Sequence, residues 1–159
     1  MRITQLLTLA LLGISAVTAT THAQTSQWVQ FQKAEDAVAY RQASFRLMET
    51  HFSRLSKMAS GTLPYDAGLA MEDAAAVKML SRLAFTAFVP NTAAPVHKSR
   101  ANDMVWSAHQ RFSDSAQALR LAANQMPVAV QTGDMGRLRK LASEAGSVCR
   151  KCHDQFRIR

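Results

Sequence analysis

Residues 138–156 read LRKLASEAGSVCRKCHDQF and combine a helical hydrophobic pattern with a short chemical motif. Apolar side chains recur every three or four residues along this stretch, which indicates one face of an amphipathic helix. The residues on that face are Leu138, Leu141, Ala145, Val148 and Cys152. Small side chains beside this face leave room for a flat ligand. A helix with one apolar face has to bury that face against partner elements.

Cys149, Cys152 and His153 form a Cys-x-x-Cys-His motif, and the chain contains no other cysteine. This spacing is typical of c-type haem attachment. Two thiols can form thioethers with the two vinyl groups of a haem, and the adjacent imidazole can ligate the iron. The motif therefore predicts one covalently attached haem c per chain, with Cys149 and Cys152 as attachment points and His153 as the iron ligand.

Two other interpretations of the cysteines are less favoured. A redox-active Cys-x-x-Cys pair usually begins a helix that follows a strand, whereas no strand pattern precedes this pair and the motif ends a helix. A zinc site needs more ligands than two cysteines and one histidine, and no second cluster of such residues is present. A haem-free helical binding module is a third hypothesis. Colour distinguishes it, because a purified protein without a Soret band has no haem.

The first 23 residues predict a cleaved secretory signal peptide. Arg2 precedes an apolar run from Leu6 to Val17, and Thr21-His22-Ala23 is a small-x-small cleavage site. The run is shorter than the roughly 20 residues that span a bilayer, so we expect no membrane anchor in the mature chain. Residues 24–159 would then form one haem-bearing domain, and we expect its export to a bacterial periplasm.

Composition narrows the fold and the function classes. The chain has 159 residues, of which 48% are hydrophobic and 7% aromatic, with only 4 Pro and 6 Gly, and this mixture favours helix over sheet. The formal charge is +8, but no run of Lys and Arg interleaved with aromatic residues indicates nucleic-acid binding. No nucleophile–base pattern, glycine-rich phosphate loop or carboxylate cluster is present, so we expect no enzymatic turnover.

Three further helical patterns precede residues 138–156. The first runs from Val38 and ends before Gly61 and Pro64. The second begins at Tyr65-Asp66, and its expected apolar stripe is Leu69, Ala76, Leu80, Leu83 and Ala87. The third follows a loop from Val89 to about Asn102, and its expected stripe is Val105, His109, Phe112, Ala116, Leu119, Ala123 and Met126.

Pro127 is expected to end or kink the third helix, and Gly133-Asp134 supplies a turn and an N-cap for the fourth. Four amphipathic helices with short connections predict an all-α, antiparallel up-down-up-down four-helix bundle with a covalently bound haem.

These features together resemble the cytochromes c′, the class II c-type cytochromes, which carry haem on a C-terminal Cys-x-x-Cys-His motif. The resemblance covers nearly all of residues 24–159. It is carried by QFQKAEDAVAYRQASFRLM at 30–48, LPYDA at 63–67, VWSA at 105–108 and CRKCHDQFR at 149–157. The first and last of these blocks are the more specific.

The resemblance implies roles for further residues. Arg41 and Gln42 match positions that the family places near a haem propionate, and a buried carboxylate would need such partners. Phe45 matches the side chain that crowds the vacant iron face. Phe85 matches an aromatic pocket wall, where some relatives have Trp. Arg157 matches a basic residue beside the proximal imidazole.

Phe45 also separates two functional hypotheses. Low-spin relatives have Met at this position as the sixth iron ligand, whereas Phe has no donor atom. The resemblance therefore implies a five-coordinate, high-spin haem that binds nitric oxide or carbon monoxide, with nitric oxide trapping or resistance and electron transfer as expected roles. The alternative is a low-spin electron-transfer cytochrome in which Met48, one turn beyond Phe45, is the sixth ligand. A homodimer through the first helix is a further implication, and the redox partner is unknown.

Overall fold

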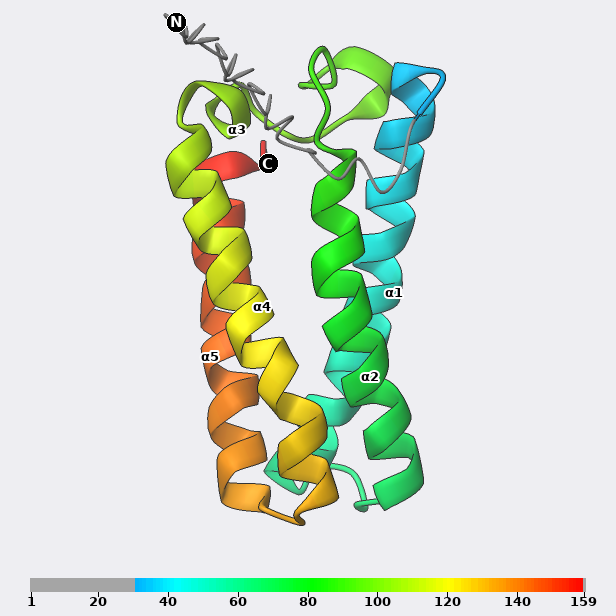
Figure 1. Cartoon of the computed structure of the whole chain (residues 1–159), viewed down its shortest axis with the longest axis vertical. Helices are drawn as coiled ribbons and strands as arrows, with labels where there is room; N and C mark the ends of the chain where they lie inside the picture. The colour runs from blue at the N-terminus through cyan, green and yellow to red at the C-terminus, as the bar shows by residue number, and fades with distance from the viewer. Residues whose placement is uncertain (1–30, 159) are drawn as a thin grey trace, which may run out of the picture.

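The computed structural model describes residues 31–158, and within this range its regular secondary structure consists of helices (Figure 1). The four long helices are α1 (Ala34–Ser60), α2 (Ala67–Leu83), α4 (His109–Gln131) and α5 (Met135–Phe156). Between α2 and α4 lie the short elements η1 (Ala84–Ala87), η2 (Val96–Lys98) and α3 (Met104–Ser107). The predicted antiparallel four-helix bundle is confirmed. The predicted signal peptide lies outside the described residues.

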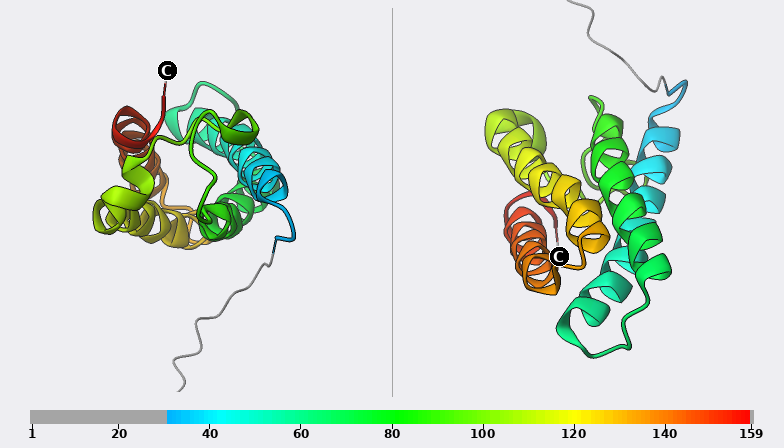
Figure 2. Two further views of the ribbon diagram at one scale, coloured as in Figure 1. Left: turned by 90° about the horizontal axis from the view of Figure 1, so that it is seen from above. Right: turned by 60° about the horizontal axis from the view of Figure 1, so that its bottom comes forward.

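The long helices follow one another around the bundle in the order α1, α2, α4 and α5, as the view from above shows (Figure 2). The first and the last helix are therefore neighbours, and the upper end carries both the start of α1 and the end of α5 (Figure 1). Toward the lower end these two helices are joined where Arg139 Nε of α5 donates to the carbonyl oxygen of Ala59, at 3.0 Å.

The helix ends follow from side-chain signals in the sequence. Gly61 adopts a φ of 79° after α1, and its N–H donates to the carbonyl oxygen of Met58 at 3.2 Å. Asp66 accepts a hydrogen bond from the N–H of Leu69 at 2.9 Å and caps α2. Asp134 caps α5 in the same way, by accepting from the N–H of Arg137 at 2.8 Å. The breaks predicted at Gly61 and at Gly133-Asp134 are confirmed.

The predicted stripe of the second helix is shifted from the buried face: Leu69 is exposed and Ala76, Leu80 and Leu83 are half-buried, whereas Ala87 is buried. The residues of α2 that are buried are Ala70, Asp73, Ala74, Val77 and Ser81, whereas Leu69 is 41% exposed. Small side chains lie inside because α2 packs closely against its neighbours, and larger ones move to the edge of the interface. The α-helix also ends at Leu83 and continues as the 3₁₀ helix η1 to Ala87. The first helix begins at Ala34, one turn before the predicted Val38.

The third predicted helix is divided into two. Ala108 has φ −117° and ψ 41°, which ends α3 and lets α4 begin at His109. This break shifts the helical phase, so His109 is exposed and does not share a buried stripe with Val105 and Phe112. Pro127 does not end α4, which continues to Gln131.

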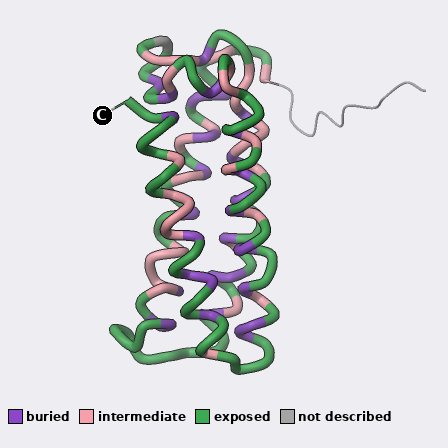
Figure 3. Tube along the Cα trace, turned by 90° about the vertical axis from the view of Figure 1, so that its left-hand side faces the viewer, coloured by how far each residue is buried: buried purple, intermediate pink, exposed green. Residues whose placement is uncertain are grey.

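The interior is rich in alanine, and buried residues face inward along all four long helices (Figure 3). The main hydrophobic cluster takes residues from each of these helices, among them Leu55, Val77, Met126 and Leu138. A second cluster forms at the upper end from Ala101, Val105, Phe112 and Phe156. Within residues 31–158, no helix is both long enough and apolar enough to cross a bilayer.

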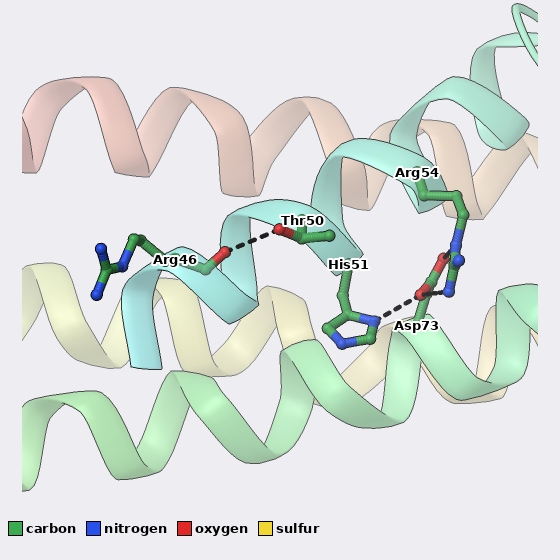
Figure 4. A network of polar contacts seen from close by, with 5 residues as sticks. All are labelled: Arg46, Thr50, His51, Arg54 and Asp73. Atoms are coloured by element: carbon green, nitrogen blue, oxygen red, sulfur yellow. Dashed lines mark hydrogen bonds and ion pairs between the residues drawn. The ribbon is translucent and has the colours of Figure 1, made fainter. Parts of the chain in front are cut away.

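One buried carboxylate links α1 to α2. The side chain of Asp73 has no exposed surface, and it accepts hydrogen bonds from Arg54 at 2.8 and 2.7 Å and lies 2.8 Å from Nδ1 of His51 (Figure 4). Burial alone would raise the pKa of this carboxyl, but the hydrogen bonds and charges of Arg54 and His51 outweigh it, and the pKa lies below its ordinary value. Asp73 is therefore ionised at neutral pH.

Candidate functional site

A cavity of about 590 Å³ lies in the upper half of the bundle, between α1, η1, α4 and α5. Its lining includes all nine residues that the sequence predicts for the site: Arg41, Gln42, Phe45, Met48, Phe85, Cys149, Cys152, His153 and Arg157. Eight of these residues come from α1 or from the C-terminal part of the chain, and they meet because α1 and α5 are neighbours in the bundle, whereas Phe85 comes from η1. The volume is within the range of protein pockets that hold small molecules and cofactors.

The α5 wall of the cavity carries the Cys-x-x-Cys-His motif in the last two turns of the helix. The thiols of Cys149 and Cys152 are half-buried and are not linked to each other. Burial raises the pKa of both thiols, and that of Cys152 rises to about 11. A helix C-terminus also disfavours a thiolate. The pair therefore lacks the lowered pKa that activates redox-active Cys-x-x-Cys motifs at helix N-termini.

His153 also has an environment that favours its neutral form. Burial and the charge of Arg157 lower the pKa of the imidazole, and together they outweigh the nearby carboxylates of Glu49 and Asp154, which raise it. The neutral imidazole is the form that can ligate a metal ion.

The α1 wall contains a buried cation. Arg41 is 3% exposed. Its guanidinium donates to the carbonyl oxygens of Ala87 and Thr92, at 3.1 and 2.5 Å, and to the hydroxyls of Thr92 and Ser99, both at 2.7 Å. Burial lowers its pKa to about 10, so the group stays charged at neutral pH. All four acceptors are neutral, so the charge of Arg41 is not balanced by these contacts.

Gln42, next to Arg41, has its Nε2 within 3.0 Å of the carbonyl oxygen of Lys98, which ties the connection between α2 and α3 to the start of α1. Phe45 and Met48 follow on the same helix and also line the cavity. Phe45 is half-buried, whereas Met48 is only 6% exposed. Both side chains proposed for the open iron face are thus present in the cavity.

Four aromatic residues of the cavity were not predicted as site residues from the sequence: Phe52, Phe88, Phe112 and Phe156. The last three form a continuous group of rings with Phe45 and Phe85, with neighbouring centroids 4.7–6.2 Å apart. Phe88 follows Phe85 by three residues, and this spacing was a local signal that the two rings share a face. Phe112 and Phe156 lie far along the chain and had no such signal.

The lining fits a haem. Six phenylalanine rings, Met48 and other apolar side chains suit a flat apolar ring system, and a buried cation with only neutral acceptors suits a carboxylate at its edge. Two thiols and an imidazole stand on one wall, where covalent attachment and iron ligation would need them.

A protein-family model described as Cytochrome C′ matches residues 36–157. A cytochrome c′ from Rubrivivax gelatinosus is 40% identical over 128 residues, which make up 80% of this chain and 98% of that relative. The chain belongs to the cytochrome c′ family. Proteins of this family carry covalently attached haem c, so a haem c is the cofactor of this cytochrome.

Other relatives agree with this assignment. A cytochrome c′ from Alcaligenes xylosoxydans xylosoxydans is 35% identical over 128 residues, with 80% of this chain and 98% of that relative covered. The crystal structure of the Rubrivivax gelatinosus protein matches with a TM-score of 0.76, over 81% of this chain and all of that one. A nitric oxide complex of a cytochrome c prime variant from Alcaligenes xylosoxidans matches with a TM-score of 0.74 at 34% identity, over 82% of this chain and 99% of that one.

Proposed function

We propose that this cytochrome c′ binds small gases such as nitric oxide and carbon monoxide at a five-coordinate, high-spin haem. The observation that carries the proposal is Phe45, which occupies the α1 wall of the cavity and has no atom that can ligate iron. A haem c would supply an iron that can bind a diatomic gas or exchange an electron. The side chains of the chain determine which ligands reach it.

Each residue of the site has an assigned role in this proposal. Cys149 and Cys152 hold the haem through thioethers, and His153 is the iron ligand, in its neutral form. Arg41 and Gln42 face a propionate. The buried charge of Arg41 supports this assignment, because a propionate would balance it.

Phe85 is part of the aromatic pocket wall, and Arg157 lies beside the imidazole of His153, whose pKa its charge lowers. Phe45 would exclude water from the open face, because an apolar ring offers water no hydrogen bond. A small apolar gas could still enter if the ring moves aside. The nitric oxide complex solved for the Alcaligenes xylosoxidans relative is in line with such binding.

Optical and resonance Raman spectra of the ferric and ferrous protein test the coordination number. We expect high-spin, five-coordinate ferrous iron in the wild type and weak carbon monoxide binding, because a packed ring has to move. Phe45→Ala should raise carbon monoxide affinity and admit an exogenous ligand. Loss of the ferrous spectrum in His153→Ala would support the assigned iron ligand, and an unchanged spectrum would remove His153 from the site.

A second function is kept because Met48 is buried and lines the same cavity. If its thioether ligates the iron, the protein is a low-spin, six-coordinate electron carrier. Met48→Ala would then convert a low-spin wild-type spectrum to a high-spin one. That result would refute the gas-binding proposal, whereas a high-spin wild-type spectrum unaffected by Met48→Ala would refute the electron carrier.

Covalent attachment has its own test. The haem of the wild-type protein should survive denaturation and acid extraction, whereas the double substitution Cys149→Ala and Cys152→Ala should release it. Free extraction of haem from the wild type would show that these two thiols are not the attachment points.

We also propose export to a periplasm and a role in nitric oxide trapping or resistance, and we expect no enzymatic turnover. N-terminal sequencing of the protein from a bacterial periplasmic extract should begin at Gln24, and a first residue within 1–23 would refute the cleavage site. We further propose a homodimer through α1, and sedimentation velocity of the haem-loaded protein should give the mass of two chains.

A further inference from the structure

The ring of Phe45 is held by two other aromatic rings. Its centroid lies 5.5 Å from that of Phe85, with the ring planes at 86°, and 6.2 Å from that of Phe88, at 68°. Both arrangements are edge-to-face, the geometry that aromatic pairs favour. Any movement of Phe45 away from its position therefore breaks two favourable contacts at once.

Phe85 and Phe88 are also held by contacts with other groups. The ring of Phe112 on α4 lies 4.7 Å from Phe88 and 5.7 Å from Phe85, and the two rings of the pair lie 6.1 Å apart. The guanidinium carbon of Arg41 lies 4.6 Å from the centroid of Phe88. Arg41 cannot easily move, because four hydrogen bonds to residues 87–99 hold it.

This arrangement is asymmetric. All three rings line the cavity, but Phe85 and Phe88 each contact three rings, and Phe88 also contacts Arg41, whereas Phe45 contacts two rings. An incoming ligand that needs space at the open face would therefore displace Phe45 and leave the other two rings in place. The energy of the two edge-to-face contacts becomes part of the barrier to entry.

We propose that Phe85 and Phe88 are positioning residues that hold the Phe45 ring over the open iron face, and so set the rate at which a small gas reaches the iron. This inference rests on the proposed gas-binding function. It adds Phe88 to the site and gives Phe85 a role that acts through Phe45 and does not require contact with the ligand.

The test is the rate constant of carbon monoxide association with the ferrous, haem-loaded protein, measured by flash photolysis. Phe85→Leu and Phe88→Leu should each raise it about threefold to tenfold, and tenfold corresponds to about 1.4 kcal/mol. Phe31→Leu is the matched control, because Phe31 also makes an edge-to-face ring contact, with Tyr40 at 5.3 Å, but is not among the residues that line the cavity. The control should change the rate less than twofold.

A double-mutant cycle separates an effect through Phe45 from a general loosening of the pocket. In a Phe45→Ala background, Phe85→Leu and Phe88→Leu should change the rate less than twofold, because the ring that they hold is gone. An equal change in both backgrounds, or no change in the wild-type background, overturns the proposal.

A second measurement does not depend on gas binding. Crystal structures of the unliganded ferrous proteins should show Phe45 in one conformer in the wild type and in more than one in Phe85→Leu. A single unchanged conformer in the variant overturns the proposal. If either leucine variant loses its helical circular dichroism, Phe85→Ile or Phe88→Ile replaces it. A low-spin, six-coordinate wild-type spectrum would instead overturn the gas-binding function on which the inference rests.

Discussion

Replacement of Arg41 by Met should destabilise the protein by about 3 kcal/mol. The substitution keeps a long, unbranched side chain but removes all four hydrogen bonds of the guanidinium. Two of the acceptors keep a second partner: the hydroxyl of Thr92 donates to Val89, and the hydroxyl oxygen of Ser99 accepts from the N–H of Ala101. The energetic cost therefore comes mainly from the other two acceptors, which are backbone carbonyl oxygens.

Each buried carbonyl oxygen without a partner costs about 1–3 kcal/mol, which gives about 2–6 kcal/mol for the two. The removal of a buried guanidinium offsets part of this loss, because a guanidinium is costly to remove from water. The net loss of about 3 kcal/mol is a large part of the roughly 5–15 kcal/mol that stabilises a typical domain. Arg41→Lys should fall between the two proteins, because an ammonium keeps the charge but donates from a single point.

The assay is urea unfolding of the haem-loaded proteins at neutral pH, followed by far-ultraviolet circular dichroism. Arg46→Met is the matched control, because Arg46 is an exposed arginine on the same helix, and its substitution should stay within about 0.5 kcal/mol of the wild type. An Arg41→Met protein within 1 kcal/mol of the wild type would refute the reasoning, because the desolvation of the guanidinium would then cancel its hydrogen bonds.

Two further predictions concern stability. Asp73→Asn should lower the urea midpoint at pH 7, and the difference from the wild type should shrink below about pH 4. The reason is that the pKa of Asp73 is lowered in the folded state. Its carboxylate therefore stabilises the protein above the unfolded-state pKa, and this stabilisation is lost as the pH falls through the folded-state pKa. Exposed Glu72→Gln is the control, and a difference that does not change with pH would contradict the ionic contribution. Gly61→Ala should lower the melting temperature by a loss of about 1 kcal/mol, because the φ of 79° is strained for alanine although nothing lies within 4 Å of the added Cβ. Gly136→Ala, within α5 and with its nearest contact at 3.5 Å, should leave the melting temperature unchanged or raise it, and equal effects at the two glycines would argue against backbone strain.

The parts of the fold that the sequence predicted correctly depend on local signals. Asp66 and Asp134 cap helices through their own side chains, and Gly61 ends α1 by its backbone freedom. The buried face of α2 was missed because hydrophobicity favours Leu69 over alanine. In the structure, close packing and the ion pair of Asp73 decide which side lies inside.

The candidate site likewise has a part that local sequence signals predict and a part that depends on the packing of separate helices. The Cys-x-x-Cys-His motif is contiguous, so five residues of sequence were enough to predict it. Phe112 joins the cavity only because α4 begins at His109 and brings its ring against Phe85 and Phe88. That contact depends on the packing of separate helices and left no short-range signal in the chain.

The cavity lies where α1 and α5, the helices farthest apart along the chain, become neighbours (Figure 2). Contacts between α1 and α2, and between α4 and α5, form between consecutive long helices and close short loops. The contact between α1 and α5, which we call the α1–α5 seam, closes a loop that contains most of the domain. Loop-closure entropy grows with the length of the closed segment, so we expect this seam to be the slowest contact to form during folding. A chain with both hairpins made and the seam still open would leave the α5 thiols accessible from one side. The topology thus gives the attachment of the cofactor an opportunity before the bundle is complete.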